Sequence, residues 1–361
     1  MKIYFDHQLF NIQKFGGGSN YIVNLVENLS SNLNPLIISP FYKNHYLKKC
    51  KKSHKFFQFN KLGYLSKYSS KFNQFYFDFF SKFNKPDIIH YSYFNEKIIY
   101  KTQAKTVITE FDLIKEKFYN KDFKDQIEFK NNLFKKIDKI ICISENTKKD
   151  LLNIYNLDSS KISVIHLAVK KDKNYREKFL KLNPFILFVG SRARYKNFKN
   201  FLIAFSTSTI CKKNLDIVCF GDKKFSKEEE DLFKKLSISR KKIHHFIGDE
   251  LDLNFFYKEA KAFIYPSLYE GFGIPLLEAM NMDCPVACSN TSSFPEIAGK
   301  AAEYFNPNNT ESIKLSIEKI INSQEISDNL IKEGKKNLQK FSWIECAKKT
   351  EELYYNLKNA T

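Results

Sequence analysis

One stretch, residues 262–288, constrains the fold of this 361-residue chain more than any other. It opens with the apolar run Ala262–Tyr265, which predicts a buried strand. The turn Glu270–Gly273 contains two glycines, and Ile274-Pro275 after it predicts the start of a helix, because proline is favoured near the first helical position. A second short strand is predicted at 285–288. This order of strand, glycine turn and helix is typical of a site that binds an anion.

The start of the predicted helix forms this anion site together with the turn before it. Glycine lets the backbone approach a ligand closely, and the free N–H groups and the dipole of a helix N-terminus both favour negative charge. Two carboxylates flank the position, Glu270 in the turn and Glu278 on the helix. N–H groups suit a phosphate and carboxylates suit hydroxyl groups, so the stretch predicts a sugar-phosphate site. An ordinary strand–turn–helix unit with both Glu side chains in water is the alternative.

The two glutamates also carry a family resemblance. Their spacing resembles the Glu-x7-Glu signature of the retaining glycosyltransferases of family four, and the surrounding Tyr-Pro-Ser-x-Tyr-Glu-Gly-Phe-Gly-Ile-Pro-x-x-Glu-Ala-Met is a long match. The resemblance, to a bacterial mannosyltransferase-like subgroup, implies an α/β fold of GT-B architecture, with two Rossmann-like, doubly wound domains facing across a cleft. It implies that Glu270 is catalytic and faces the donor sugar, and that Glu278 binds the ribose. The donor-binding residues that it implies here are Gly271, Phe272, Gly273, Ile274 and Glu278.

Three glycines at 16–18 predict a second loop–helix anion site near the N-terminus. Apolar residues at helical spacing follow them, so a helix is expected directly after the glycines. A plain turn is an equally good interpretation of a triple glycine. The surrounding pattern from Asp6 to Tyr21 is similar to the N-terminus of a bacterial subgroup of the same family. That similarity implies that Gly17 and Gly18 face the phosphates of the donor.

A third candidate site follows the predicted strand Phe185–Gly190. The chain contains four arginines, and two of them, Arg192 and Arg194, lie close together at the end of this strand. Arginine gives planar, bidentate contacts to phosphate that lysine cannot give. A solvated surface loop is the alternative. The segment resembles the phosphate loop of the family, which implies that Arg192 and Lys196 act in catalysis by holding the donor diphosphate and that Arg194 is a further donor-binding residue. A nucleotide base is expected near Ile247, at the end of another predicted strand.

The chain departs from the family at 109–112. The family usually has Thr-x-His-Asp there, with the His near the reacting hydroxyl groups, whereas this chain has Phe111 at the His position. Phenylalanine can neither form a hydrogen bond nor transfer a proton. Because ligands bind at the carboxyl ends of parallel strands, we expect at least one of His90, Glu110 and Asp112 to face the donor sugar. A buried, hydrogen-bonded histidine is the alternative for His90.

Alternating strands and helices predict a parallel, doubly wound sheet in each of two domains. We expect an acceptor-binding domain at 1–170, a nucleotide-sugar-binding domain at 171–340 and a C-terminal helix at 341–361. The charged segment 168–183 lacks apolar periodicity and is the expected linker. The family resemblance implies that the last helix packs back on the first domain.

Composition excludes several other classes of protein. Hydrophobic residues make up 43% of the chain and aromatic residues 16%, which argues against a disordered chain. No run of about 18 uncharged apolar residues occurs, so no membrane-spanning helix is expected. The first residues are typical of a strand and not of a signal peptide. The seven cysteines are scattered, and we expect buried free thiols in a reducing cytoplasm.

Positive charge is concentrated in the N-terminal half of this chain of net charge +19. Residues 1–180 contain 32 Lys and Arg against 17 Asp and Glu. No acidic residue occurs between Glu27 and Asp78, a span that alternates aromatic residues with lysines, among them Lys48, Lys49, Lys51 and Lys52. Such a surface attracts anionic lipid or nucleic acid. Compositional bias is an alternative, but bias would raise lysine in both halves. We therefore expect an anionic membrane surface as a partner, and no nucleic acid.

These expectations combine into one functional hypothesis. The chain is expected to be a retaining glycosyltransferase that moves a hexose from a nucleotide-diphosphate sugar to a hydroxyl of a glycan or glycolipid acceptor. No cofactor and no metal are expected, since the sequence has no Asp-x-Asp motif. The resemblance implies cell-surface polysaccharide or lipopolysaccharide synthesis by a cytoplasmic protein bound peripherally to the inner face of the membrane. The alternatives are a non-catalytic subunit that binds a membrane or a partner, for which Phe111 is the argument, and an epimerase or phosphorylase of the same architecture.

Overall fold

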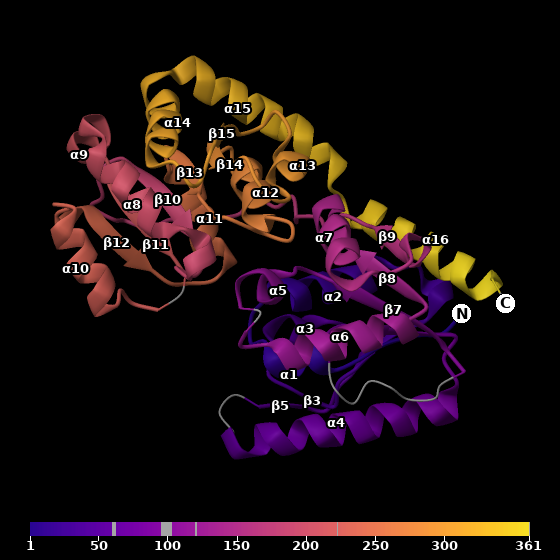
Figure 1. The fold of residues 1–361 in the computed structure, drawn as a ribbon. Coiled ribbons are helices and arrows are strands. Elements are labelled where there is room, and N and C mark those ends of the chain that lie inside the picture. Colours follow the sequence, from indigo (N-terminus) through magenta and orange to yellow (C-terminus); the bar gives the residue numbers. More distant parts are fainter. Residues whose placement is uncertain (60–62, 95–102, 120, 222, 361) are drawn as a thin grey trace. The chain divides into compact units, whose positions relative to one another are not determined.

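The computed structural model describes residues 1–59, 63–94, 103–119, 121–221 and 223–360. The chain forms two compact units of mixed helices and strands (Figure 1). The N-terminal unit consists of Met1–Ala168 together with Ser342–Thr361, and the C-terminal unit consists of Val169–Phe341. The chain therefore leaves the first unit after residue 168 and returns to it at residue 342.

The N-terminal unit is built on a parallel sheet. Within the described ranges seven strands form it, in the order β4-β2-β1-β6-β7-β8-β9, and every neighbouring pair runs parallel. Parallel strands need crossover connections, which agrees with the predicted doubly wound sheet. The strands are β1 (Ile3–Phe5), β2 (Pro35–Ile38), β4 (Ser53–His54), β6 (Ile88–Tyr91), β7 (Lys105–Glu110), β8 (Lys139–Cys142) and β9 (Ile162–Val164).

Helices cover both faces of this sheet. Successive residues of a strand point to opposite faces, so Ile89 and His90 in β6 mark the two sides. Ile89 belongs to an apolar core with Phe77 of α4 and Phe134 of α6, while His90 contacts Tyr354 of α16. The helices of the unit are α1 (Gln8–Ile12), α2 (Gly17–Asn28), α3 (His45–Lys49), α4 (Gly63–Asn84), α5 (Ile114–Phe118), α6 (Lys124–Lys136), α7 (Glu145–Tyr155) and α16 (Trp343–Asn359).

The last helix, α16, is part of the N-terminal unit through specific contacts. The hydroxyl of Tyr354 lies 2.6 Å from Nδ1 of His90, and both side chains are fully buried. Toward the end of the helix, Nζ of Lys358 lies 2.9 Å from the carboxylate of Asp87. Trp343, at its start, packs near Tyr21 of α2, with ring centroids 6.2 Å apart. The helix therefore completes one face of a sheet whose strands come from the first half of the chain.

The lysine-rich span after β2 is folded into short elements. Nζ of Lys52 donates hydrogen bonds to the main-chain carbonyls of Val26 and Leu29 at the end of α2, at 3.1 and 2.7 Å. Nζ of Lys55 does the same at the end of α3, to the carbonyl of Leu47 at 2.7 Å. These ammonium groups satisfy carbonyls that a helix leaves free and complement its dipole. The span also supplies a two-stranded parallel sheet of β3 (Phe41–Tyr42) and β5 (Phe57–Gln58).

The C-terminal unit has a second parallel sheet, of six strands in the order β12-β11-β10-β13-β14-β15 within the described residues. The strand, turn and helix predicted from residue 262 onward are present as β13, a turn and α12. The strands are β10 (Phe185–Val189), β11 (Asp216–Phe220), β12 (Ile243–Phe246), β13 (Ala262–Tyr265), β14 (Val286–Ser289) and β15 (Glu303–Phe305). The helices are α8 (Phe198–Thr207), α9 (Thr209–Asn214), α10 (Lys227–Lys235), α11 (Glu250–Glu259), α12 (Ile274–Asn281), α13 (Phe294–Ala298), α14 (Thr310–Asn322) and α15 (Gln324–Asn337).

The segment expected to link the domains is fastened to the C-terminal unit. Residues 165–183, all of which are described, form neither helix nor strand. The guanidinium of Arg176 lies 2.9 Å from the carboxylate of Asp249 and 2.5 Å from that of Asp252, in the N-terminal capping box of α11. The side-chain amide of Asn254 donates to a main-chain carbonyl of the same segment at 2.8 Å. Charge in this segment thus serves to hold it against α11.

All seven cysteines are free and buried, as the sequence predicts for those beside apolar runs. Burial raises the pKa of the Cys50 and Cys346 thiols to about 12. A thiol with such a pKa stays protonated at neutral pH, and the protonated form is neither a nucleophile nor a metal ligand. These cysteines therefore behave as small apolar side chains of the two cores.

The contact between α16 and β6 generates a prediction about stability. In Tyr354→Phe, Nδ1 of His90 loses its partner inside the core, and such an unsatisfied buried group costs about 1–3 kcal/mol. We expect the free energy of unfolding to fall by that amount, measured by urea denaturation and circular dichroism. Tyr355→Phe is the matched control, because the next side chain on the same helix is 44% exposed. Equal losses in the two variants would contradict this role for the buried hydroxyl.

Candidate functional site

The carboxyl ends of β10 and β11 leave open backbone at one edge of the C-terminal sheet. Gly190 after β10 and Gly221 after β11 have φ values of +106° and +92°, a conformation that favours glycine. A Cβ at Gly221 would lie only 3.7 Å from Cα of Gly190, and a Cβ at Gly190 would lie 4.0 Å from Nζ of Lys196. The ammonium of Lys196 therefore lies over the end of β10, at the edge where parallel sheets bind ligands.

Lys196 and Glu270 form an ion pair at this edge. Nζ of Lys196 lies 2.6 Å from Oε1 of Glu270 and 3.3 Å from the hydroxyl of Tyr265, the last residue of β13. The two charged side chains are only 12% and 11% exposed, so their attraction is screened less than that of a surface pair. The structure thus brings together two residues that the sequence predicts to be catalytic. The ammonium can bind a phosphate, and the carboxylate can accept hydrogen bonds from hydroxyl groups.

The turn that carries Glu270 is held by two serines at the start of α13. The main-chain N–H of Glu270 donates to the hydroxyl of Ser292 at 2.9 Å. The hydroxyl of Ser293 donates to the carbonyls of Glu270 and Phe272, at 3.0 and 2.9 Å. A Cβ at Gly273, whose φ is +97°, would lie 3.1 Å from a ring carbon of α13, so glycine is required there. The predicted donor-binding residues in this turn and at the start of α12 are Gly271, Phe272, Gly273 and Ile274.

Glu278 lies further along α12 and is half-buried. The hydroxyl of Tyr257, on α11, donates a hydrogen bond to its Oε2 at 3.2 Å. Burial raises the pKa of Glu278 to about 7; the Tyr257 hydrogen bond opposes this rise and the nearby Glu250 carboxylate adds to it. Near neutral pH both forms of the carboxyl are therefore populated. A ligand that donates hydrogen bonds to this group would favour the ionised form.

Arg192 and Lys196, predicted to act together on a diphosphate, are held by different partners. Nε of Arg192 lies 2.5 Å from Oε1 of Glu229, in the first turn of α10. Its NH2 group donates to the main-chain carbonyls of 223–224 at 2.7 and 3.2 Å. The guanidinium carbon also lies 4.9 Å from the ring centroid of Phe225. These contacts fix Arg192 against α10, whereas Lys196 points to the glutamate turn.

Two further donor-binding predictions fall on exposed side chains. Arg194 lies in the short 3-10 turn Arg194–Lys196 and is exposed. Ile247, directly after β12, is 69% exposed. Both follow strands of the same sheet at its carboxyl edge, where a ligand can reach them from solvent. Their roles in donor binding stay predictions.

In the N-terminal unit, the glycine loop and the position of the substituted His are neighbours. Gly17 and Gly18 begin α2, as the sequence predicts, and Gly16 is its N-cap. A Cβ at Gly18 would lie 3.3 Å from ring carbons of Phe111. The Phe111 ring also packs edge-on against Tyr21, with centroids 5.6 Å apart. Phe111 thus occupies the space over the first turn of α2, beside the two glycines predicted to face phosphate.

His90 is enclosed by protein partners. Its Nε2 lies 2.8 Å from the hydroxyl of Thr109 and its Nδ1 lies 2.6 Å from the hydroxyl of Tyr354, and the side chain is fully buried. Burial lowers the pKa of His90 to about 3, so the ring stays neutral. Both ring nitrogens are occupied, which agrees with the alternative of a buried, hydrogen-bonded histidine and gives no support to a role at the donor sugar.

Glu110 and Asp112 also have protein partners. The Glu110 carboxylate lies 3.2 Å from Nζ of Lys130, which lies 2.6 Å from Glu116. Burial raises the pKa of Glu110 to about 8, against the opposing effect of the Lys130 charge. Asp112 is half-buried and accepts a hydrogen bond from the N–H of Ile114 at 3.0 Å, at the start of α5. Of the three side chains predicted to face a sugar, Asp112 is therefore the most exposed.

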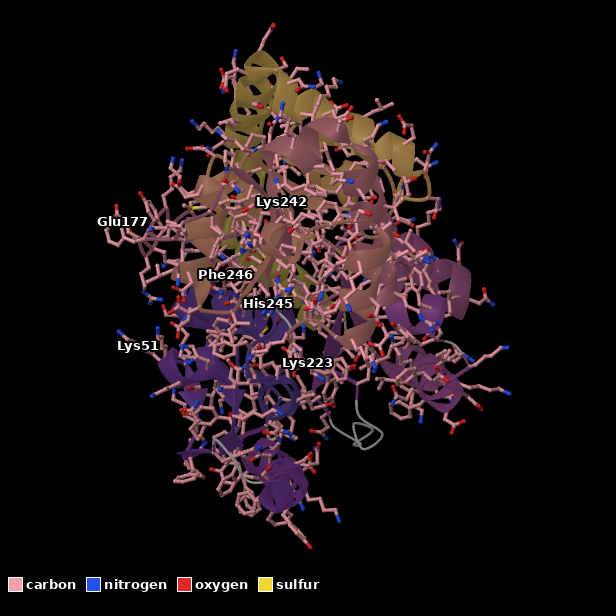
Figure 2. The ribbon with its side chains drawn as sticks, turned by 90° about the vertical axis from the view of Figure 1, so that its left-hand side faces the viewer. Lys51, Glu177, Lys223, Lys242, His245 and Phe246 are labelled. Atoms are coloured by element: carbon pink, nitrogen blue, oxygen red, sulfur yellow. The ribbon has the colours of Figure 1, made fainter. Side chains whose placement is uncertain are left out.

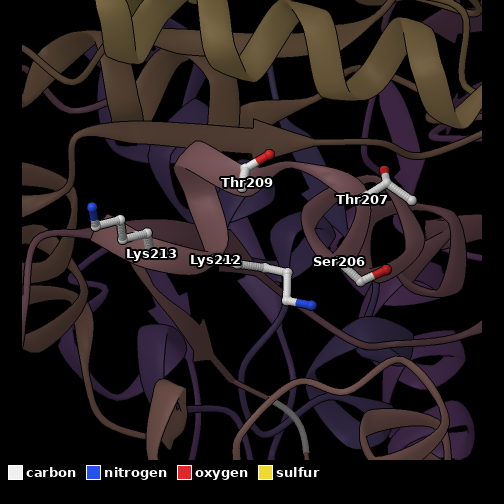
Figure 3. Close-up of a pocket in the computed structure, with 5 residues that line it drawn as sticks. All are labelled: Ser206, Thr207, Thr209, Lys212 and Lys213. Carbon is white, nitrogen blue, oxygen red and sulfur yellow. The ribbon is translucent and has the colours of Figure 1, made fainter.

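A shallow pocket of about 360 Å³ lies elsewhere in the C-terminal unit, between α8 and α9 (Figure 3). Hydroxyl groups and two lysine side chains surround it at the surface, and none of the predicted site residues lines it. It therefore plays no part in the candidate site. The lining residues are Ser206, Thr207, Thr209, Lys212 and Lys213.

The residues that position the charged groups could not be predicted from the sequence. Ser292 and Ser293 lie in a polar turn that the sequence shows, but their contacts with the glutamate turn depend on how β14 pairs with β13. Tyr265 ends the predicted strand Ala262–Tyr265, and this position is the available signal for its contact with Lys196. Tyr257 gives no local signal, because it lies on another helix, 21 residues before Glu278.

Two protein-family models match the chain, one for each half. The model described as Glycosyltransferase Family 4 matches residues 15–173. The model described as Glycosyl transferases group 1 matches residues 170–337. The matches meet in the segment between the two compact units, so together they account for most of both.

Curated relatives match over part of their length. The O-antigen chain mannosyltransferase B of Escherichia coli is 26% identical over 230 residues, which are 60% of this chain and 60% of the relative. The O-antigen chain mannosyltransferase RfbU of Salmonella typhimurium is 33% identical over 186 residues, 50% of each. The chain thus spans between about half and three fifths of the length of these two relatives.

Solved structures match over the whole chain. Sucrose-phosphate synthase from Thermosynechococcus elongatus has a TM-score of 0.75 at 15% identity, covering 100% of this chain and 99% of that one. Anabaena Alr3699/HepE, solved in complex with UDP and glucose, has a TM-score of 0.74 at 12% identity, covering 98% of each chain. This likeness confirms the predicted GT-B fold of two Rossmann-like domains. With both halves of its sequence matched and the fold shared, the chain consists of a Glycosyltransferase Family 4 domain followed by a Glycosyl transferases group 1 domain.

Proposed function

We propose that this protein is a retaining glycosyltransferase that moves a hexose from a nucleotide-diphosphate sugar to a hydroxyl of a glycan or glycolipid. The observation that carries the proposal is the Lys196–Glu270 ion pair at the carboxyl edge of the C-terminal sheet. It combines a cation for a diphosphate with a carboxylate for sugar hydroxyls. Glu278 lies on α12, which begins beside the pair, and its carboxylate can accept hydrogen bonds from ribose hydroxyls.

The chemistry of the site follows from these charges. A donor diphosphate would compete with Glu270 for the Lys196 ammonium and would release the carboxylate toward the donor sugar. Negative charge that develops on the departing diphosphate would be stabilised by Lys196 and by the free N–H groups at the start of α12. Arg192 would have to leave Glu229 to reach the same phosphates. We therefore assign the larger share of the charge stabilisation to Lys196. Retention of configuration rests on the family.

Similar proteins guide the choice of substrates. The curated relatives are named as O-antigen mannosyltransferases, which favours mannose as the first sugar to test and cell-surface polysaccharide or lipopolysaccharide synthesis as the process. The structural neighbour in complex with UDP and glucose supports a nucleoside diphosphate as the leaving group. UDP, GDP and ADP are therefore the probes of choice for the base.

The proposal includes an acceptor at the cytoplasmic, inner face of a membrane, with the protein bound peripherally. Its support is the concentration of positive charge in the N-terminal half. Across the part of the chain that the structure describes, no helix is long and apolar enough to cross a bilayer.

Removal of the Lys196 charge should weaken nucleotide binding. A charge-assisted hydrogen bond is worth about 1.5–3 kcal/mol, so Lys196→Ala should lower the affinity for the nucleoside diphosphate by about 10- to 150-fold in calorimetry. Lys199→Ala removes an exposed lysine from the same segment and is the control. Arg192→Ala should have a smaller effect, because Glu229 already holds this guanidinium. Unchanged affinity in Lys196→Ala would remove the ion pair from the donor site.

Nucleotide affinity should rise with pH through the titration of Glu278. Its pKa is about 7 in the free protein, and hydrogen bonds from ribose hydroxyls favour the ionised form. Below this pKa a proton must first be lost, so the titration of Glu278 alone should lower affinity about tenfold from pH 8 to pH 6. Calorimetry with the same nucleoside diphosphate at several pH values measures the slope.

Glu278→Gln is the control for this pH dependence. The terminal phosphate of the ligand also titrates, with a pKa near 6, so the wild-type slope contains two contributions. The pH slope of the variant should contain only the phosphate contribution. At pH 8 the variant should bind the nucleoside diphosphate more weakly than the wild type does. Parallel slopes in the two proteins would show that Glu278 does not titrate on binding.

The structure also predicts that Phe111→His is tolerated. The ring at 111 packs beside Gly18 and Tyr21 without a hydrogen bond that the substitution would break, so the folded state should be retained. Transfer assayed with a panel of nucleotide sugars should be unchanged or faster in the variant. Phe111→Ala controls for loss of the ring. If the wild type transfers no sugar from any donor while Phe111→His does, the natural chain is a non-catalytic member of the family.

A further inference from the structure

Helix α4 of the N-terminal unit exposes aromatic side chains along one side. Phe75, Phe79 and Phe83 are 67%, 53% and 68% exposed, and Tyr68 and Phe72 are 64% and 44% exposed. Their spacing of three and four residues places them on one face of the helix. We call these five residues the aromatic stripe. Single exposed apolar side chains are ordinary on protein surfaces, but a row of five is not.

Rings on the exposed side of α4 contact one another in two groups. The ring centroids of Phe75 and Phe79 are 6.4 Å apart, and those of Phe79 and Phe83 are 4.6 Å apart. At the other end, Tyr76 lies 6.2 Å from Phe72 and 5.5 Å from Phe56, which is itself 58% exposed. Exposed rings therefore run along the helix and onto the residues before β5.

The inner side of α4 fixes the stripe in its outward position. Phe77 is buried in the core of the unit. Asn73, fully buried, accepts a hydrogen bond from the N–H of Phe41 at 2.9 Å and donates to Asn11 at 3.0 Å. Rotation of the helix to bury the stripe would break these contacts. In Figure 1, α4 runs along the outside of the N-terminal unit, beyond β3 and β5.

The charge around the stripe is positive. Lys71 and Lys82 are exposed on the helix and Lys85 is exposed just after it. The one acidic residue of the helix, Asp78, is half-buried and accepts a hydrogen bond from Gln74 at 3.0 Å. The exposed side of α4 thus combines aromatic rings with ammonium groups and, among its described side chains, has no exposed carboxylate. Such a surface complements a layer that is apolar inside and anionic at its edge.

We propose that α4 lies in the interface of an anionic lipid bilayer, with the aromatic stripe below the headgroups and Lys71, Lys82 and Lys85 on the lipid phosphates. A second copy of the chain is a poorer occupant, because pairing two such faces would place lysines against lysines. The helix carries too much charge to cross the bilayer, which leaves a position parallel to its surface. This inference rests on the peripheral membrane binding of the proposed function and deepens it, but it concerns a surface separate from the donor site and does not depend on glycosyl transfer.

With the aromatic stripe, the set of residues expected to contact the membrane differs from the one expected from the sequence. Of the four lysines expected there from the sequence, Lys52 is committed to the carbonyls at the end of α2. Lys48, Lys49 and Lys51 are exposed, and Lys51 points outward from the edge of the unit (Figure 2). These three can add long-range attraction, which salt screens within about 10 Å. Insertion of the stripe would add a contribution that salt does not remove.

The test is vesicle binding by the full chain. Phosphatidylcholine vesicles with phosphatidylglycerol should bind the wild type, and vesicles of phosphatidylcholine alone should bind it much more weakly. The combined variant Phe75→Ser, Phe79→Ser, Phe83→Ser should lower the partition constant at least about tenfold, because each buried Phe contributes strongly. The matched control replaces three exposed apolar residues outside the stripe and should bind as the wild type does; its substitutions are Phe179→Ser, Leu315→Ser and Ile344→Ser.

A fluorescent probe separates insertion from surface attraction. The chain has one tryptophan, Trp343, so Phe79→Trp in a Trp343→Phe background places the only indole in the stripe. Its emission should shift to the blue on vesicle binding and be quenched by lipids with brominated acyl chains. Binding without quenching would overturn the proposal in favour of lysine attraction alone.

Two further outcomes would also overturn it. Unchanged vesicle binding in the stripe variant would exclude the aromatic rings from the contact. A wild type that elutes as a dimer and a stripe variant that elutes as a monomer in gel filtration would assign the stripe to a second copy of the chain. Thermal unfolding of the variant should match the wild type, since all three rings are exposed, so that a loss of binding reports the surface and not the fold.

Discussion

Parallel pairing of the strands is the constraint on which the rest of the structure depends. Every neighbouring pair in the two main sheets runs parallel, so each connection must cross from one end of a sheet to the other. The carboxyl ends of all strands in a sheet therefore lie at the same edge. For this reason Lys196 and Glu270, 74 residues apart in sequence, lie 2.6 Å from each other. The same rule brings Gly18, after β1, beside Phe111, after β7.

The Lys196–Glu270 pair gives the candidate site a particular electrostatic state. Neither charge is left uncompensated in the free protein, although both are largely removed from water. An unpaired buried charge would be costly, and the pair avoids that cost before any ligand arrives. Binding of an anion then becomes an exchange of partners rather than the capture of a free cation. Affinity for the donor should therefore depend on how well its sugar satisfies the carboxylate that it displaces.

Sequence reasoning succeeded where structure follows from neighbouring residues and failed where it depends on distant ones. The strand, turn and helix from 262 to 281 could be predicted, because apolar pattern, glycine and proline act locally. Residue type alone could not place the guanidinium of Arg192, since its partner Glu229 is 37 residues away and depends on the path of α10. Likewise, Lys52 is indistinguishable in the sequence from Lys51, but its ammonium donates hydrogen bonds to carbonyls at the end of α2, whereas Lys51 contacts that helix through its main-chain N–H.

The buried side of helix α4 likewise could not be predicted from neighbouring residues. In the sequence of this helix, aromatic residues occur on all sides. Periodicity therefore could not decide which rings form the core. Contacts such as those of Phe77 with the core and of Asn73 with β3 select the buried side, and they leave Phe75 and Phe79 exposed.

The return of α16 to the N-terminal unit has a consequence for biosynthesis. The unit that leaves the ribosome first has its strands and most of its helices by residue 168, but lacks the helix that covers His90 until residues 342–359 have emerged. At the usual rate of translation the intervening 173 residues take roughly 9–35 s. During that interval α2 covers part of that face through Tyr21, but the region around His90 has no cover from its own chain. A chaperone that binds nascent chains is expected to bind there, and to be displaced when Tyr354 packs against His90.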